Sequence, residues 1–196
     1  MHLKPQIRPV IAFILVLSVS ACAQDSVKPE NSAACSNTSN LMDDVRFADV
    51  NGAEGPWRYA QHAGEKSFAI SSIDGVMQIE RISGQPWMLL RQTVESSDFA
   101  GATVQFSAEL KGDVPAEPRL HGFEHKAGLY LNIGNRKDPV SADHEPNSGV
   151  WDWQKVSVNK VVPAGESSVH IGFLHQSGGT LWVRNPMLTI SDCGSE

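Results

Sequence analysis

Two tryptophans, Trp151 and Trp153, stand one residue apart at the head of an apolar stretch that closes with Pro-Ala-Gly at 163–165. An exposed indole ring can stack on the CH face of a sugar, whereas a buried one fills a hydrophobic core. Trp151 follows the Ser-Gly of a loop, so we expect it to be exposed and to contact a ligand. We expect Trp153, which opens the strand, to pack into the core.

A second group of candidate ligand-binding residues consists of polar side chains that alternate with apolar ones. Donors, acceptors and a ring on one sheet face suit a hydroxyl-rich ligand, because each hydroxyl both donates and accepts a hydrogen bond. The same alternation also produces an ordinary solvated sheet face, and this alternative stays open. The group consists of Arg91, Gln105, Glu109, Tyr130 and Asn132, together with His175.

Known catalytic motifs do not occur in the sequence. It contains no Gly-x-Ser-x-Gly, no His-Glu-x-x-His and no glycine loop of the kind that binds phosphate. Glu109 and Glu124 are the one carboxylate pair that we would test for glycoside hydrolysis. We therefore predict no catalytic residues and favour a protein that is not an enzyme.

Some of the histidines have the spacing of metal ligands, but their surroundings do not favour a metal site. His121 and His125 have the spacing of two ligands on a helix, but Gly-Phe-Glu between them and the strand after them indicate no helix. Asp138, Asp143 and Glu145 share a polar loop without the regular spacing of a calcium loop. We predict no metal site and no cofactor.

The first 21 residues predict an export signal. Lys4 and Arg8 precede an apolar run over 10–19, which is too short to span a bilayer. The sequence "VSAC" resembles the bacterial lipobox, in which Cys22 would carry a diacylglycerol and become the new N-terminus. Ala23, by resemblance to known sorting signals, favours the outer membrane, at its periplasmic side or its surface. Ordinary cleavage at a neighbouring alanine is the alternative.

Cys35 and Cys193 lie near the two ends of the exported chain. Two cysteines in an oxidising compartment favour a disulfide, which would hold the termini side by side. Two free thiols or a metal-binding pair are the alternatives.

The charge of the chain bears on its partners. Loss of residues 1–21 removes two basic residues and leaves 14 Lys and Arg against 22 Asp and Glu, a net charge of −8. This balance argues against a nucleic acid partner. The basic residues are also scattered, so the acyl chains on Cys22 would have to provide the contact with the lipid bilayer.

The pattern along the exported chain predicts a tether over 22–40 and one all-β domain over 41–196. The tether is rich in Ser, Asn, Ala and Pro, which cannot form a core. The domain shows short alternating segments between turn residues, which favours two stacked antiparallel sheets in a sandwich or jelly roll. Only 41–50 could form a short helix. The predicted strands are 68–73, 76–82, 87–94, 102–110, 128–134, 155–162, 168–175 and 180–190.

Residues 152–190 resemble the closing strands of the galactose-binding-domain-like jelly roll found in carbohydrate-binding modules. A tryptophan opens a strand, a proline turn follows, and then come an apolar strand with a central glycine, a Gly-rich turn and a last strand. The earlier segments 88–94, 102–112 and 127–134 agree in order. The resemblance implies a β-sandwich with neighbouring terminal strands. Such modules usually carry an acidic calcium ligand where this chain has Arg184 and Asn185, so a structural calcium is doubtful.

These observations together favour a lipid-anchored, non-catalytic envelope protein that resembles a carbohydrate-binding module. It would bind a glycan or serve as an accessory surface for another envelope protein. One alternative is a small polysaccharide lyase or a glycosidase, because jelly-roll lyases use tyrosine and histidine, here Tyr130 with His175 or His121. Another alternative is a structural or protein-docking module. Fold alone does not decide among these functions.

Overall fold

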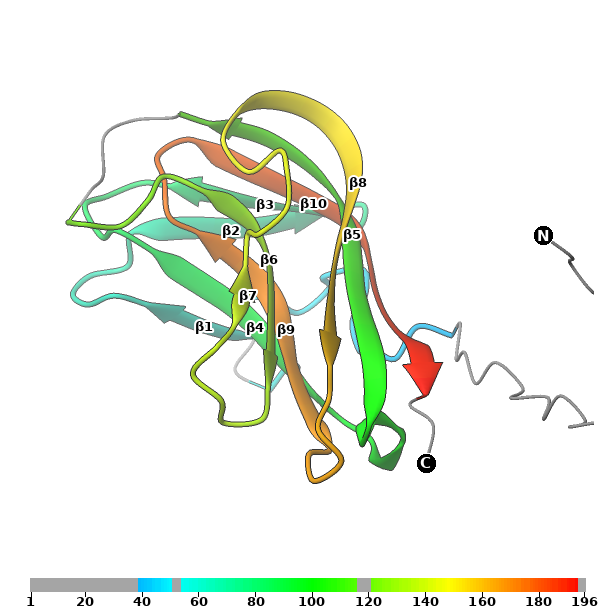
Figure 1. The fold of residues 1–196 in the computed structure, drawn as a ribbon. Coiled ribbons are helices and arrows are strands. Elements are labelled where there is room, and N and C mark those ends of the chain that lie inside the picture. The colour runs from blue at the N-terminus through cyan, green and yellow to red at the C-terminus, as the bar shows by residue number, and fades with distance from the viewer. Residues whose placement is uncertain (1–38, 51–53, 116–120, 194–196) are drawn as a thin grey trace, which may run out of the picture. The chain divides into compact units, whose positions relative to one another are not determined.

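The computed structural model describes residues 39–50, 54–115 and 121–193, which form two antiparallel sheets packed face to face (Figure 1). The one helical element of these residues is the 3-10 turn η1, Ser97–Phe99. The all-β, two-sheet sandwich expected from the sequence is confirmed. Residues 41–50, where a short helix was possible, form turns instead.

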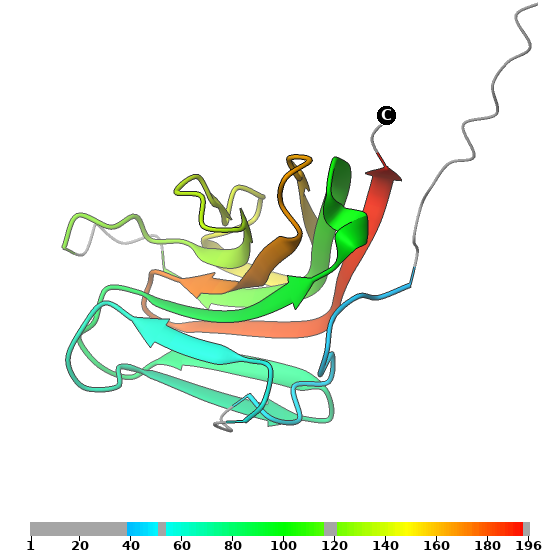
Figure 2. The same cartoon turned by 90° about the horizontal axis from the view of Figure 1, so that it is seen from below.

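Each sheet has five strands. Sheet I has the order β1-β4-β9-β6-β7, with bounds Arg58–Gln61, Met88–Glu95, Ser168–His175, Ala127–Ile133 and Val140–Ser141. Sheet II has the order β2-β3-β10-β5-β8, with bounds Phe68–Ile73, Val76–Arg81, Thr180–Cys193, Ala102–Val114 and Gly149–Val161. Figure 2 shows β5 and β10 of sheet II running side by side. Every predicted segment matches a strand with at most one residue beyond its bounds, whereas the first half of β8 and the two short strands β1 and β7 were not predicted.

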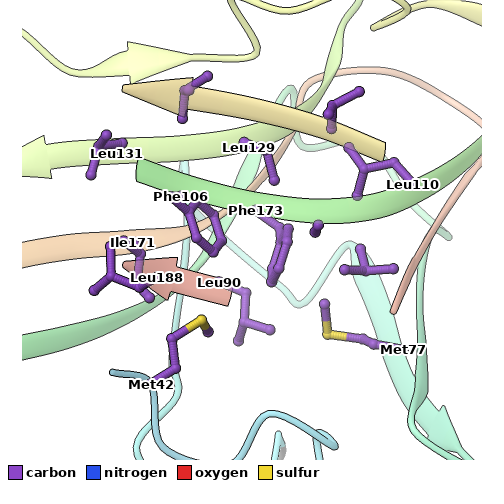
Figure 3. Close-up of a cluster of buried hydrophobic side chains, with 14 of the residues drawn as sticks. Met42, Met77, Leu90, Phe106, Leu110, Leu129, Leu131, Ile171, Phe173 and Leu188 are labelled. Carbon is purple, nitrogen blue, oxygen red and sulfur yellow. The ribbon is translucent and has the colours of Figure 1, made fainter. Parts of the chain in front are cut away.

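The core lies between the sheets because alternate residues of each strand point inward. In β5 the buried residues are Val104, Phe106, Ala108 and Leu110, as the sequence alternation predicts. Phe173 of β9 occupies the centre of this layer (Figure 3). Its ring centroid lies 5.7 Å from that of Phe106, 5.8 Å from that of Trp57 and 5.9 Å from that of Phe47. Phe173 therefore joins both sheets to the N-terminal loop.

The first described residues are bound along β10, the strand that ends with Cys193. The side chain of Asn40 donates to the carbonyl of Pro186 (2.8 Å) and accepts from the amide of Leu188 (3.1 Å). The amide of Leu41 donates to the carbonyl of Leu188 at 3.0 Å. Cys22, Cys35 and the side chain of Cys193 lie outside the described residues, so the lipid anchor and the disulfide stay predictions.

We predict that Phe173→Ala lowers the free energy of unfolding by about 3–5 kcal/mol, because it removes a fully buried ring between the two sheets. Urea unfolding followed by tryptophan fluorescence measures the loss. Val161→Ala is the control, since Val161 is 64% exposed and its truncation should change the stability by less than about 0.5 kcal/mol. Equal effects of the two substitutions would contradict the central role of Phe173.

Candidate functional site

The outward face of sheet I brings together three of the predicted ligand-binding residues. Arg91 of β4 lies opposite Gly172 of β9, which in turn lies opposite Tyr130 of β6. Asn132, two residues beyond Tyr130, shares that face. Their neighbours Leu90, Leu129 and Phe173 point into the core, which fixes the outward direction of these side chains.

These outward groups act on one another electrostatically. Burial raises the pKa of the Tyr130 phenol, and the charge of Arg91 and the side chain of Asn132 lower it in part. Burial lowers the pKa of His170, and the charge of Arg91 lowers it further. His170 also forms a hydrogen bond of 2.9 Å between its Nδ1 and the hydroxyl of Thr93 on β4. The charge of Arg91 therefore acts on both Tyr130 and His170.

The side-chain amide of Asn132 is fixed by a hydrogen bond to the backbone of the turn that follows β6. Its nitrogen donates to the carbonyl of Arg136 at 2.9 Å. Its carbonyl oxygen is buried and has no hydrogen-bond partner among the described residues. A buried acceptor without a partner costs free energy, so a buried water at this oxygen would be stabilising.

An open hollow of about 530 Å³ lies on the same outward face. Its floor includes Leu89 and Leu174, which are directly opposite each other and two residues along the strands from Arg91 and Gly172. Its volume lies in the range of small-molecule sites. The hollow is lined by His62, Trp87, Leu89, Phe123, Lys126, Ser141, Leu174 and Gln176.

Aromatic rings and polar groups share the wall of this hollow. The His62 ring meets Trp87 and Phe123 edge to face, with centroid distances of 6.3 and 6.0 Å. Lys126 lies 3.9 Å from a carboxylate oxygen of Glu124 and 3.9 Å from one of Asp143. An apolar floor, ring faces and a few polar groups are the features of a site for an amphipathic ligand.

No residue that lines this hollow was predicted to bind a ligand, although the sequence holds one signal for it. Trp87 lies within a predicted strand, which favours the core by default, yet Trp87, Leu89 and Arg91 follow the same alternation, and Arg91 was placed outward. Applying the period of two consistently would have put Trp87 on the ligand face. Phe123 lies in a loop, where no periodicity indicates its direction.

The predicted directions of Trp151 and Trp153 are wrong. Trp151 is 8% exposed and packs over Gly112, where any Cβ would collide with the indole ring. Trp153 lies on the outward face of sheet II, with the guanidinium of Arg184 4.2 Å from its ring centroid. For Trp151 the cause is an extra residue in β8 between the positions that pair with Leu110 and Gly112, because a bulge reverses the alternation beyond it. Trp153 needs no such reversal, because it shares the outward face of Lys155 and Ser157.

Two other predicted residues lie away from Arg91 and Tyr130. Gln105 is on the outward face of sheet II, because β5 belongs to that sheet. His175 is fully buried on the inward face of β9. The expectation that the whole polar group shares one face is therefore wrong for Gln105 and His175, and also for Glu109, which lies on sheet II like Gln105.

The residues proposed for the two enzyme alternatives are not brought together as pairs. Tyr130 points outward from sheet I, whereas His175 points into the core. Glu109 lies on sheet II and is bound by Arg184 (2.7 Å) and by the amide of Asn185 (2.8 Å). These hydrogen bonds lower the pKa of the Glu109 carboxyl, so it stays ionised. Glu124 lies beside the sheet I hollow, next to Lys126.

No group of three or more potential metal ligands occurs in the described part of the chain. The Nε2 atom of His144 accepts a hydrogen bond from the amide of Leu129 at 3.0 Å, and burial lowers the pKa of its ring. His125 contacts the hydroxyl of Ser177 at 3.2 Å. Over residues 39–50, 54–115 and 121–193, no helix has the length and apolar character needed to span a membrane.

Another hollow of about 700 Å³ lies beside the turn between β2 and β3. Its lining includes Arg46, Asp74 and Asn185 but no aromatic ring. It therefore lacks the ring faces that distinguish the hollow on sheet I.

Comparison with known proteins supports the fold. No protein-family model and no curated protein sequence matches the chain. A family 4 carbohydrate-binding module matches 79% of the chain over 98% of its own length, with 16% identity and a TM-score of 0.50. A candidate sugar-binding protein from Bacteroides thetaiotaomicron matches 78% over 100% of its length, with 12% identity and a TM-score of 0.50.

The enzymatically active domain of tailspike protein 4 from bacteriophage CBA120 matches 76% of the chain, with 13% identity and a TM-score of 0.54. The chain spans only 21% of that protein. At these identities the similarity shows the fold alone. The described domain thus has the β-sandwich fold of carbohydrate-binding modules, as the resemblance of residues 152–190 implied.

We predict that the protein loses stability as the pH falls from about 6.5 towards 3. Burial lowers the pKa of His175 from 6.5 to about 3, so in this range the unfolded chain binds a proton at His175 that the folded chain does not. The free energy of unfolding then falls with the pH, by at most about 1.4 kcal/mol per unit for this residue.

Urea unfolding at pH 7 and pH 5 tests this expectation. His144 and His170 also have lowered pKa values and contribute in the same direction, so the comparison must isolate His175. His175→Gln should reduce the difference in stability between the two pH values. An unchanged difference would show that His175 is not the cause.

Proposed function

We propose that this domain binds a glycan, without catalysing a reaction, on the outward face of sheet I. The observation that carries the proposal is the hollow lined by Trp87, Phe123 and His62, which lies beside the row of Arg91 and Tyr130. The fold of carbohydrate-binding modules agrees with this function but does not by itself establish it.

The composition of the site suits a sugar. A pyranose ring has an apolar CH face, for which Trp87, Leu89 and Leu174 supply apolar surface, and a rim of hydroxyls. Lys126 donates hydrogen bonds, whereas Gln176 and Ser141 each donate and accept them. The phenol of Tyr130 extends this polar surface along β6, since Tyr130 lies opposite Ser141 of the hollow.

Display in the envelope is the second part of the proposal. The apolar run over 10–19 and the lipobox-like "VSAC" support export and a diacylglycerol on Cys22. The segment 22–40 would then act as a tether between the outer membrane and the sandwich. Attachment of Asn40 to β10 supports the disulfide between Cys35 and Cys193, since it places the chain entering the domain beside the last strand.

We predict that Trp87→Ala weakens retention of the protein on its glycan by roughly thirtyfold, the loss of about 2 kcal/mol expected when a central aromatic contact is truncated. A glycan array and pull-down on insoluble polysaccharides identify the ligand, and titration calorimetry measures the affinity. Phe123→Ala should act in the same direction.

Trp182→Ala is the matched control for this experiment. Trp182 is a partly exposed tryptophan on the outward face of sheet II, so its truncation removes a similar ring far from the proposed site. Retention on no glycan at all, or equal losses for Trp87→Ala and Trp182→Ala, would overturn the proposed function.

We predict that Cys22→Ser moves the protein from the membrane fraction to the soluble exported fraction, because it removes the atom that would carry the acyl chains. Fractionation of cells with detection of the protein measures the distribution, and mass spectrometry of the N-terminal peptide measures acylation. Cys35→Ser is the control and should leave the protein in the membrane fraction. Wild-type protein without acyl groups on Cys22 would contradict the anchor.

A further inference from the structure

Two arginines lie directly opposite each other at the edge of the proposed site. Arg58 of β1 and Arg91 of β4 are register partners in an antiparallel pair, and both are exposed. Like charges in this arrangement repel each other and destabilise the pair. Within the described part of the chain, neither arginine forms an ion pair with a carboxylate. The fold therefore holds two positive charges together without a neutralising partner.

The position of Arg58 is fixed by its own strand. Its guanidinium donates to the carbonyl of Gly55 and, at 2.9 Å, to the carbonyl of Trp57. Trp57 is buried in the core, so these bonds attach Arg58 to a rigid part of the domain. Moving Arg58 away from Arg91 would break them.

A glycine, which has no side chain, separates Arg91 from Tyr130 across the sheet. Gly172 lies between them in the register, and a Cβ at this position would collide with the carbonyl oxygen of Leu90. The distance from β4 to β6 corresponds to two strand spacings, about 10 Å. Gly172 therefore contributes no side chain between the guanidinium and the phenol.

The acidic groups of this face lie elsewhere. Glu124 and Asp143 both lie within 3.9 Å of Lys126, so the lysine of the hollow already has carboxylate partners. Glu95 is on the outward side of β4 but lies four residues from Arg91, about 13 Å along the strand. Arg58 and Arg91 are thus left without a carboxylate partner among the described residues.

We propose that the ligand is an acidic polysaccharide, and that Arg91 and Arg58 bind the carboxylate of a uronic acid unit. The planar guanidinium donates two parallel hydrogen bonds to a carboxylate, and the shared negative charge removes the repulsion between the arginines. The hollow lies two residues along the strands, about 7 Å away, and takes the apolar face of the next sugar unit.

Local charge is essential for such a ligand because the chain as a whole is negative, with a formal net charge of −6. A negative protein repels a polyanion at long range, so non-specific attraction would not produce binding. Recognition of a uronate polymer would have to come from the arginine pair. This inference rests on the glycan-binding function proposed above and names its ligand class.

Titration calorimetry with the full chain in detergent tests the inference. The probes are polygalacturonate, alginate and glucuronoxylan, each compared with its methyl-esterified form, which keeps the backbone and removes the charge. We expect at least one uronate polymer to bind roughly ten- to hundredfold more tightly than its ester, the effect of a hydrogen bond to a charged group. Arg91→Gln and Arg58→Gln should each reduce this preference.

Arg46→Gln is the matched control, because Arg46 is an exposed arginine outside both the hollow and the arginine pair, and it should keep the preference. Equal binding of every acid and its ester, or a preference that survives Arg91→Gln and Arg58→Gln, overturns the inference. Binding to neutral polysaccharides that depends on Trp87, without any preference for uronates, overturns the inference but leaves the proposed function standing. Binding to no glycan overturns both.

Discussion

The packing of the two sheets against each other determines which residues this domain offers to other molecules. Each strand has two faces, and burial of one of them in the core leaves the other for solvent or ligand. Phe173 lies at the centre of the buried layer, in contact with Phe47, Trp57 and Phe106. With Phe173 directed inward, Gly172 and Leu174 must face outward, and with them their partners on β4 and β6.

Two glycines then decide how closely neighbouring groups pack against the sheets. Gly172 permits the backbones of β9 and β4 to approach closely and places no side chain between Arg91 and Tyr130. Gly112 has a different effect, because the space above it is filled by the indole of Trp151. The bulge in β8 directs Trp151 inward, whereas Trp153 keeps the outward direction of Lys155 and Ser157. The missing side chain at Gly112 thus makes room for an aromatic ring on the buried side of sheet II.

The sequence predicted the strands well because alternation is a local property, and it placed Arg91, Tyr130 and Asn132 on one face. Alternation does not tell which sheet a strand joins, so Gln105 was grouped with residues on the opposite side of the sandwich. A single extra residue in β8 also reversed the direction expected for Trp151. The bulge depends on pairing between distant strands, which no local pattern records.

The two outward faces differ in whether their aromatic rings are free. On sheet II, Arg184 covers the ring of Trp153 at 4.2 Å, and Lys111 lies 6.0 Å from the ring centroid of Trp182. These cations already occupy the ring faces, so stacking by a ligand would first have to displace them. On sheet I, Trp87 makes an edge-to-face contact with the His62 ring and borders an open volume of about 530 Å³. Only the sheet I face, among the described residues, combines accessible rings with unneutralised arginines, which is why binding is assigned there.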